Sequence, residues 1–510
     1  MAVNWGYSPK VQRFIPLGDF PADRYLVIAR QAIENLGWKL SHLSGSGIIA
    51  YTGISLQSYS EEVSITIKSN FAIFKSECIG VQLLFNDYGK NDLNLEKFFH
   101  EFEYIEFHFK DSWEARLADF HEYIASQDDS YLDRAPLITK DKIKNVLYLC
   151  YPQRNYWVTP LLVNLCLLYF LVMVAGAAVF FSQGAAQPAE LVEKLTDFYL
   201  KFGANSRDKV LSGELWRLIS GMFMHFSLAH LFFNMYALVY IGLMIENKLG
   251  PAAFAAVYLL SGICGSILSV YTHHVGIMVG ASGAIMGMFG AFLALLISNA
   301  FEKSANKALL ISTVILVTYM LLNGLATKGV DNAAHFGGIV SGFVTGYLLF
   351  NARLFGVRVA MVYRAALSLF LVAGLFVLVY LSSPRYQMKE YAKLKAEFNQ
   401  NDSDFYQVYN LSVTMSRSEQ LELVRRYGIG MSERNLKITR EMKQLVLTGR
   451  DKLDLGYRKQ VAEKEYRAAM LMYKDIKSGK SIHKTEIQDL VNGLNQLKIE
   501  LAGKLRDMEH

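Results

Sequence analysis

The sequence is poor in the residues that build disulfide frameworks and zinc sites. Its 510 residues include four cysteines, and no two of them form a C-x-x-C pair. The H-E-x-x-H motif of zinc metalloproteases is also lacking, although His121 is followed by Glu122. We therefore expect no disulfide framework, no metal site and no other cofactor.

Two further features are missing, and each narrows the class of protein. The first residues, MAVNWGYSPKVQRF, contain no apolar stretch of the kind found in a cleavable signal peptide, so we expect a cytoplasmic N-terminus. The formal charge of +6 is modest, and no nucleic-acid-binding signature accompanies the charged C-terminal region. We therefore expect no nucleic acid among the partners.

Apolar residues are abundant, at 52% of the chain, but they are unevenly distributed. Long apolar runs dominate the middle of the chain, whereas the N-terminal part is mixed and the C-terminal part is highly charged. This pattern predicts an N-terminal cytoplasmic α+β domain at 1–156, a transmembrane domain at 157–383 and a C-terminal extracytoplasmic helical region at 384–510.

The N-terminal region shows both helical and strand periodicity. Residues 22–36 place apolar side chains at helical spacing, and residues 92–126 also resemble a helix. Apolar and polar residues alternate at 63–68, which is typical of a half-buried strand, and Ser69-Asn70 suits a tight turn into the next strand. A small α+β fold follows.

The middle region contains enough long apolar stretches to cross a bilayer seven times. A helix needs about 20 apolar residues to span the hydrocarbon. The chain is thus predicted to be a polytopic α-helical membrane protein, with the lipid bilayer as its surroundings. The predicted spans are 158–182, 226–246, 252–271, 281–299, 307–326, 333–352 and 364–382.

Basic residues indicate the orientation of these spans. They are concentrated in the connections on one side, for example at Lys248, at Lys303 and at Arg358. Because cytoplasmic loops carry an excess of Lys and Arg, we expect the N-terminus inside and the C-terminus outside. A bacterial inner membrane is the expected location. The C-terminal region is predicted to form amphipathic helices separated by glycines, namely Gly428, Gly430, Gly456 and Gly479.

The fourth and sixth spans carry a serine and a histidine among small residues. Gly280-Ala281-Ser282-Gly283 alone is more typical of close helix packing than of chemistry. His335, however, is costly inside an apolar helix and requires a partner. If the two glycine-rich faces meet, Ser282 and His335 come within hydrogen-bond reach, and this arrangement activates a serine hydroxyl.

The second span adds two hydrogen-bond donors. His230 and Asn234 are four residues apart and so lie on one helix face. Donors directed at a developing oxyanion are what peptide hydrolysis requires. Each residue alone is equally compatible with a structural role, but together with Ser282 and His335 they predict an active site. Asp331 has no second carboxylate nearby, which argues against an aspartyl protease.

These motifs, ELWR (214–217), HFSLAHLFFN (225–234), GASGAIMG (280–287) and AHFGG (334–338), together resemble the rhomboid family of intramembrane serine proteases. The resemblance covers residues 157–352. It implies a six-helix core with a seventh helix added at its C-terminal end, a Ser–His dyad without an acidic third member, and single-span membrane proteins as substrates, cut near the outer leaflet through an acyl-enzyme. The resemblance implies that Ser282 is the nucleophile and His335 the base, with His230 and Asn234 as oxyanion donors. It implies that Glu214, Trp216 and Arg217 anchor the first loop. The neighbours of the dyad would be Gly280, Gly283 and Met286.

The sequence departs from the family at Met286, where many members have an aromatic residue packed against the histidine. Methionine can fill that space, so we expect activity with a looser dyad. The alternative from another class is a weak or inactive rhomboid-like protein that binds membrane clients. A transporter would show an internal repeat, and none is present. The sequence indicates no oligomeric state.

Overall fold

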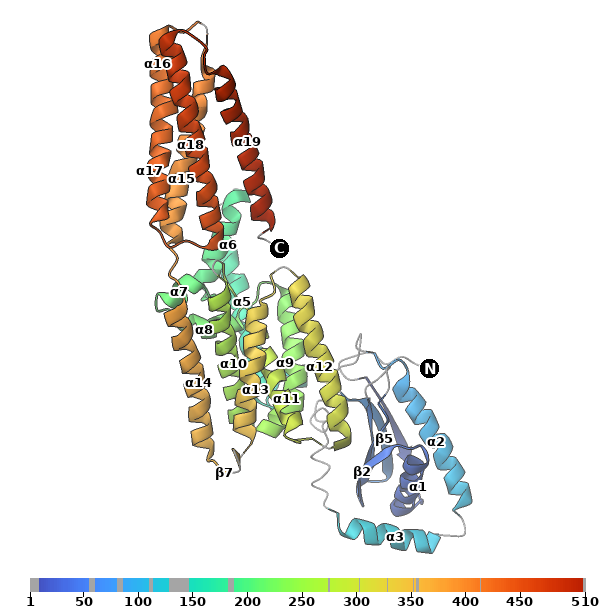
Figure 1. The fold of residues 1–510 in the computed structure, drawn as a ribbon. Coiled ribbons are helices and arrows are strands. Elements are labelled where there is room, and N and C mark those ends of the chain that lie inside the picture. Colours follow the sequence, from blue (N-terminus) through green and yellow to red (C-terminus); the bar gives the residue numbers. More distant parts are fainter. Residues whose placement is uncertain are drawn as a thin grey trace. The chain divides into compact units, whose positions relative to one another are not determined.

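The computed structural model divides into two compact units, Met1–Ser382 and Ser383–His510. Each unit is described separately below. The first contains a small sheet with its helices, followed by a bundle of apolar helices, and the second is helical (Figure 1). The residues that the structure describes are 9–54, 60–79, 86–109, 113–127, 146–181, 188–273, 276–301, 303–327, 329–351, 353–354, 357–412 and 414–507.

The N-terminal part of the first unit is a five-stranded antiparallel sheet with three helices. Its strand order is β1-β5-β4-β3-β2, so β1 crosses over to pair with β5. The predicted mixture of strands and helices is confirmed, but the helix expected at 92–126 is two helices. The elements are β1 (Lys10–Pro16), α1 (Ala22–Asn35), β2 (Lys39–Ser44), β3 (Gly47–Tyr51), β4 (Glu61–Lys68), β5 (Phe71–Cys78), α2 (Lys90–His108) and α3 (Trp113–Ala125).

The core of this part lies between one face of the sheet and the helices. Val63 and Ile65 of β4 are completely buried, as their alternation with polar residues predicted. The ring centroids of Phe74 on β5 and Phe98 on α2 lie 4.8 Å apart, which joins the sheet to that helix. Ser69 adopts a positive φ of 55° at the tight turn between β4 and β5.

Apolar helices follow in the first unit, and among the residues that the structure describes six helices are long and apolar enough to cross a membrane. The chain is therefore an integral membrane protein. The helix at the fourth predicted span, α11, has 16 residues, or about 24 Å at 1.5 Å per residue, which is shorter than the hydrocarbon core of a bilayer. The helices are α5 (Val158–Phe181), α9 (Leu228–Leu249), α10 (Pro251–Thr272), α11 (Ser282–Ile297), α12 (Lys303–Ala326), α13 (Asn332–Phe350) and α14 (Met361–Ser382), and the two-residue strands β6 (Arg353–Leu354) and β7 (Val357–Arg358) join the last two helices.

Short helices occupy the long connection between α5 and α9, which contains the first loop. Within α6, Leu191, Leu195 and Phe198 recur at the spacing of three to four residues that indicates a helix, so the signal was present. These elements are α6 (Pro188–Lys201), α7 (Arg207–Leu211), α8 (Arg217–Ser220) and the 3₁₀ turns η3 (Val146–Leu149), which precedes α5, and η4 (Gly221–Phe223).

Glycines allow α11 and α13 to pack with their backbones nearly touching. A Cβ atom added at Gly342 would lie 2.0 Å from the carbonyl oxygen of Gly287, and one added at Gly338 would lie 2.0 Å from that of Gly283. No side chain fits at such a distance. The row of small residues in the fourth and sixth spans therefore has the packing role that the sequence suggested, and it also brings the two candidate catalytic helices together.

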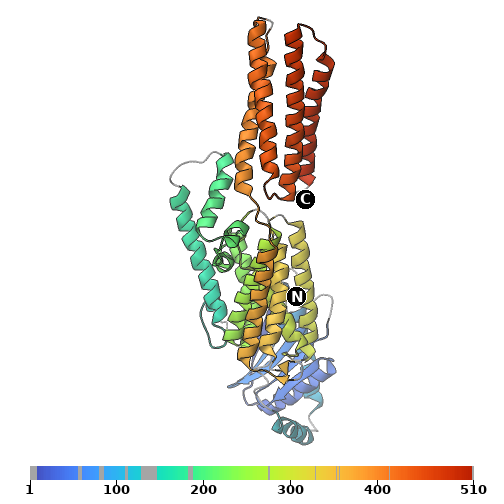
Figure 2. The ribbon, with the colours of Figure 1, turned by 60° about the vertical axis from the view of Figure 1, so that its left-hand side comes forward.

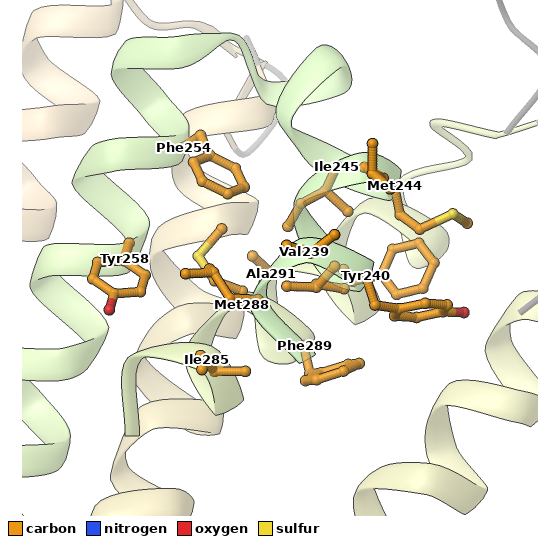
Figure 3. Close-up of a cluster of buried hydrophobic side chains, with 14 of the residues drawn as sticks. Val239, Tyr240, Met244, Ile245, Phe254, Tyr258, Ile285, Met288, Phe289 and Ala291 are labelled. Carbon is orange, nitrogen blue, oxygen red and sulfur yellow. The ribbon is translucent and has the colours of Figure 1, made fainter. Parts of the chain in front are cut away.

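Large apolar side chains fill the opposite side of α11. Figure 3 shows Met288 and Phe289 of this helix directed toward side chains of α9 and α10, among them Tyr240 and Phe254. The rings of Tyr240 and Phe289 stack with centroids 6.5 Å apart. Helix α11 is thus held by α13 on one face and by α9 and α10 on the other. Figures 1 and 2 show the helix bundle from two sides.

A buried carboxylate holds the start of α5 against α9. Glu246 is 1% exposed. Its Oε1 accepts hydrogen bonds from the backbone N–H groups of Trp157 and Val158, each at 2.7 Å. Its Oε2 accepts from the backbone N–H and the hydroxyl of Thr159, at 2.9 and 2.6 Å. The carboxylate therefore satisfies the unpaired donors at a helix N-terminus, where negative charge is stabilising.

Replacing Glu246 with glutamine should destabilise the membrane bundle. The amide has one acceptor oxygen in place of two, so buried donors at the start of α5 lose their partner. We expect the free energy of unfolding to fall by about 2–3 kcal/mol. Unfolding titrations in mixed micelles would measure it, and a change below about 0.5 kcal/mol would contradict this account of Glu246.

Three buried arginines complete the C-terminal ends of helices in the same unit. Arg364 donates to the carbonyl groups at the end of α13, including that of Asn351 at 2.7 Å. Arg207 donates in the same way to Val270 at the end of α10, at 2.7 Å. Arg217 donates to Leu200 at 2.7 Å, near the end of α6. Positive charge is favourable at these ends, so the arginines fix the connections between helices.

The second unit consists of long helices packed around their own apolar cores. Gly479 ends α18 with a φ of 70°, but the other glycines do not separate helices as predicted. Gly428 lies in a π-helical turn, Gly430 begins α17 and Gly456 lies within α18. A glycine costs only about 1 kcal/mol in a helix, and packing offsets that cost. The elements are α15 (Met388–Phe405), η5 (Tyr406–Asn410), α16 (Arg417–Leu423), η6 (Val424–Ile429), α17 (Gly430–Lys443), α18 (Gly449–Ser478) and α19 (Lys484–Asp507).

Candidate active site

The structure brings the serine and the histidine of the fourth and sixth spans together. Ser282 is the first residue of α11, and His335 lies in the first turn of α13. The Nε2 atom of His335 lies 2.9 Å from the Oγ atom of Ser282. His335 is 7% exposed, and its Nδ1 atom is buried without a hydrogen-bond partner in the described part of the chain. The serine hydroxyl can therefore donate to a histidine that is shielded from water.

His230 reaches the same place from α9. The helix begins at Leu228, after the N-cap residue Ser227, whose hydroxyl accepts a hydrogen bond from the backbone N–H of His230 at 3.1 Å. The point that a Cβ atom on Gly280 would occupy is 3.0 Å from Nε2 of His230 and 3.8 Å from Oγ of Ser282. The imidazole of His230 and the serine hydroxyl thus face one small space beside Gly280.

Gly280 is required at that place for two reasons. Its φ of +133° is one that residues with side chains rarely adopt, and a Cβ atom would press against the His230 ring. The extended segment that contains it is held by backbone hydrogen bonds, from Met278 to Asn205 at 2.8 Å and from Gly280 to Gly221 at 2.9 Å. The chain is therefore fixed where it enters α11.

Asn234 lies one turn further along α9 and is buried. Its Nδ2 atom donates to the carbonyl oxygen of His230 at 3.0 Å, which orients the amide toward the cavity side of the helix. Gly283 packs against Ala334 of α13. A Cβ atom added to Gly283 would lie 3.4 Å from the carbonyl oxygen of Ala334. Met286 is completely buried and belongs to the large apolar cluster of the bundle.

Ser282, His335, His230 and Asn234 line one cavity of about 580 Å³, which is large enough for several residues of an extended peptide. Its walls are mostly apolar, with polar groups among them. The residues that line it include Asn205, Met222, Phe226, His230, Phe233, Asn234, Ser266, Ser269, His273, Met278, Gly280, Ser282, Gly283, Met320, Asp331 and His335. An apolar cleft with few converging polar groups is typical of a binding site.

The three predicted residues of the first loop form a separate cluster. The Arg217 guanidinium donates to Glu214, with Nε to Oε2 at 2.8 Å, and its carbon lies 4.5 Å from the centre of the Trp216 ring. Hydrogen bonds from Arg217 and Lys209 lower the pKa of Glu214 below its usual range. Since Arg217 also binds the carbonyl of Leu200, the cluster joins α6 to α8.

Two further residues lie close to the site: Asp331, whose capping role was not predicted from the sequence, and His225, for which a place in the polar network around the dyad and a plain loop role were both considered. Asp331 is the N-cap of α13, and its carboxylate accepts a hydrogen bond from Ser269 on α10. His225 is 1% exposed, and its ring centroid lies 5.0 Å from that of His230. Burial, together with the neighbouring His230, lowers the pKa of His225 to about 4, so this histidine is neutral at pH 7.

Among the described residues, no group of three or more His, Cys, Asp or Glu side chains could hold a metal ion. The fold and the cavity define a helical membrane protein with a serine and a histidine in contact at the buried ends of two helices.

Comparison with known proteins identifies the family. Residues 212–352 match the model of the rhomboid domain. RHOMBOID-like protein 5 of Arabidopsis thaliana is 40% identical over 31% of this chain and 51% of its own length. Rhomboid protease GluP of Bacillus subtilis is 34% identical over 38% and 37%, and rhomboid protease AarA of Providencia stuartii is 35% identical over 28% and 58%. The chain therefore contains a rhomboid domain, and the matches span about half or less of the length of most of these relatives.

Proposed function

We propose that the protein is an intramembrane serine endopeptidase in which Ser282 is the nucleophile and His335 the general base. The observation that carries this proposal is the 2.9 Å separation of His335 Nε2 and Ser282 Oγ within the cavity. A nucleophile and a base within hydrogen-bond reach are the arrangement by which covalent catalysis activates a serine. Two of the relatives are named rhomboid proteases, and this supports the proposed protease function.

The reaction we propose proceeds through an acyl-enzyme. Ser282 Oγ attacks the carbonyl carbon of the scissile peptide bond while His335 accepts the hydroxyl proton. The tetrahedral oxyanion receives hydrogen bonds from the side chains of His230 and Asn234 and from the backbone N–H of Ser282. His335 then gives its proton to the leaving amine, and water releases the acyl group by the same steps in reverse.

The substrates we propose are single-span membrane proteins, cut near the outer leaflet. The N-terminal ends of α9, α11 and α13 line the cavity. Helix α11 is too short to cross a bilayer by itself. Ser282 at its first residue would therefore lie below the membrane surface. A helical peptide bond is shielded by its own hydrogen bonds, so the substrate helix must unwind locally before Ser282 can attack.

Cleavage of a single-span test protein in liposomes tests the proposed function. The purified full chain should produce two fragments, and mass spectrometry should place the cut in the half of the substrate helix nearer the outer leaflet. The absence of cleavage across a panel of single-span helices with helix-breaking residues would overturn the assignment and favour the client-binding alternative.

We also propose that residues 1–156 form a cytoplasmic domain, 157–383 the membrane domain and 384–510 an extracytoplasmic region, in a bacterial inner membrane. Support comes from the lysines and arginines on one side of the bundle, such as Lys248 and Lys303, and from an odd number of apolar helices, α11 included. The relatives come from bacteria and from plants, and one of the plant proteins is named as mitochondrial.

A membrane-impermeant thiol reagent tests this orientation. In a variant without native cysteines, a cysteine placed in the second unit, at exposed Lys459, should be labelled in cells whose outer barrier has been opened. A cysteine at exposed Glu106 of α2 should be labelled only after lysis. Labelling of the position in α2 before lysis would reverse the proposed topology.

A further inference from the structure

The N-terminal end of α13 is tied to α10 by a single carboxylate. Asp331 accepts a hydrogen bond from the backbone N–H of Ala334 at 2.9 Å through Oδ1, and from the Ser269 hydroxyl through Oδ2. The Nδ1 atom of His273, just after the end of α10, lies 3.7 Å from Oδ1. One side chain therefore caps α13 and joins its first turn to two residues of the neighbouring helix.

This first turn is the one that carries His335. The backbone N–H of His335 donates to the carbonyl oxygen of Asp331 at 3.1 Å, so the cap and the histidine are one helical turn apart. Glycine contacts hold α13 close to its neighbours: a Cβ on Gly265 of α10 would lie 2.7 Å from the carbonyl oxygen of Ala334. The polar link at Asp331 adds a directional contact to this close packing.

Asp331 also bears the only negative charge among the residues that line the cavity in the described part of the chain. The charged and titratable groups that face His335 are Asp331 from its own helix and His230 from α9, with His273 at the end of α10 beside Asp331. When His335 accepts the proton of Ser282 it becomes a buried cation, and its Nδ1 atom has no direct partner. A nearby anion stabilises that cation.

We propose that Asp331 is a positioning residue that acts through His335: it fixes the rotation of α13 against α10 and balances the charge of the protonated histidine. The carboxylate makes no hydrogen bond with Nδ1 of His335 and so is not the third member of a triad. This inference rests on the proposed function, because it requires His335 to act as the base for Ser282.

The test compares the rate at which a fluorophosphonate labels Ser282 in the purified full chain between pH 5 and pH 9. Asp331→Asn keeps an oxygen for the helix cap and an amide that can bind Ser269, but it removes the charge. Ser269→Ala keeps the charge and removes the link to α10. Glu246→Gln is the matched control, since it also replaces a buried carboxylate at a helix N-terminus, but Glu246 does not line the cavity.

We expect Asp331→Asn to lower the maximal labelling rate about 3- to 10-fold and to move the acid limb of the pH–rate profile to lower pH by about 0.5–1 unit, because His335 without its anion holds its proton less firmly. Ser269→Ala should lower the maximal rate while the acid limb stays in place. The Glu246→Gln variant should be less stable, but its labelling rate per folded molecule should depend on pH in the same way as that of the wild type.

Three results would overturn the inference. If the wild-type chain is labelled at Ser282 and Asp331→Asn gives the same rate and the same acid limb, the positioning role is wrong while the proposed function stands. An acid limb that moves equally in Glu246→Gln would attribute the effect to general destabilisation. A wild-type chain that is not labelled at Ser282 refutes the proposed function and this inference with it.

Discussion

Ser282→Ala and His335→Ala should each reduce cleavage of a single-span substrate by on the order of 10⁴-fold or more. The serine supplies the atom that bonds to the substrate, and without the histidine its hydroxyl keeps its proton. Because the two groups act as one unit at a separation of 2.9 Å, the double variant should be no slower than either single variant. Initial rates in liposomes of matched protein content measure all three.

The matched control for this series is Ser368→Ala. Ser368 is a buried serine of a membrane helix, α14, where its hydroxyl donates to the carbonyl of Arg364 at 3.0 Å, and it does not line the cavity. Its removal should leave the rate within about twofold of wild type. Effects of Ser282→Ala and His335→Ala that multiply in the double variant would show that the two residues do not act together.

The second large loss of activity is expected when a proposed oxyanion donor is removed. Removing one such donor typically lowers turnover by about 10²–10³. We expect His230→Ala to show this loss in kcat with little change in KM, because the donor acts on the transition state and not on the bound peptide. The ring of His230 and the hydroxyl of Ser282 face the same space beside Gly280. We therefore expect a larger loss of kcat for His230→Ala than for Asn234→Ala.

Asn234→Ala should lower kcat by a comparable but smaller factor, about 10-fold to 10²-fold, since its amide also donates to the His230 carbonyl. Asn306→Ala is the control: Asn306 donates to the carbonyl of Leu296 at the same distance of 3.0 Å, but it lies outside the cavity. Equal losses in kcat for Asn234→Ala and Asn306→Ala would contradict an oxyanion role for Asn234.

The membrane helices could be predicted from the sequence because hydrocarbon imposes a simple requirement. A stretch that crosses it must be apolar and about 20 residues long, and each of the seven predicted spans coincides with a helix to within a few residues. The length of α11 was misjudged: the prediction ran from 281 to 299, and the helix covers Ser282–Ile297. Ser298 is the C-cap of this helix and Asn299 adopts a positive φ of 54°, so the helix ends before these two polar residues.

The pairing of Ser282 with His335 was predictable because both lie on glycine-rich helix faces, and such faces pack closely. The polar links between distant segments were not. Glu246 holds the start of α5, 87 to 89 positions earlier in the chain, and Ser269 bonds Asp331 62 positions later. No local spacing indicates such contacts. They depend on which helices become neighbours, and only the folded bundle determines that.

The measurement that tests the central claim most directly is the location of a fluorophosphonate adduct in the full chain. An activated serine attacks the phosphorus, fluoride leaves, and the adduct stays on the oxygen. Mass spectrometry of the wild-type protein should find the label on Ser282, and His335→Ala should reduce it at least 10²-fold. A label on another cavity serine such as Ser266, or equal labelling of Ser282 in His335→Ala, would contradict the Ser282–His335 dyad.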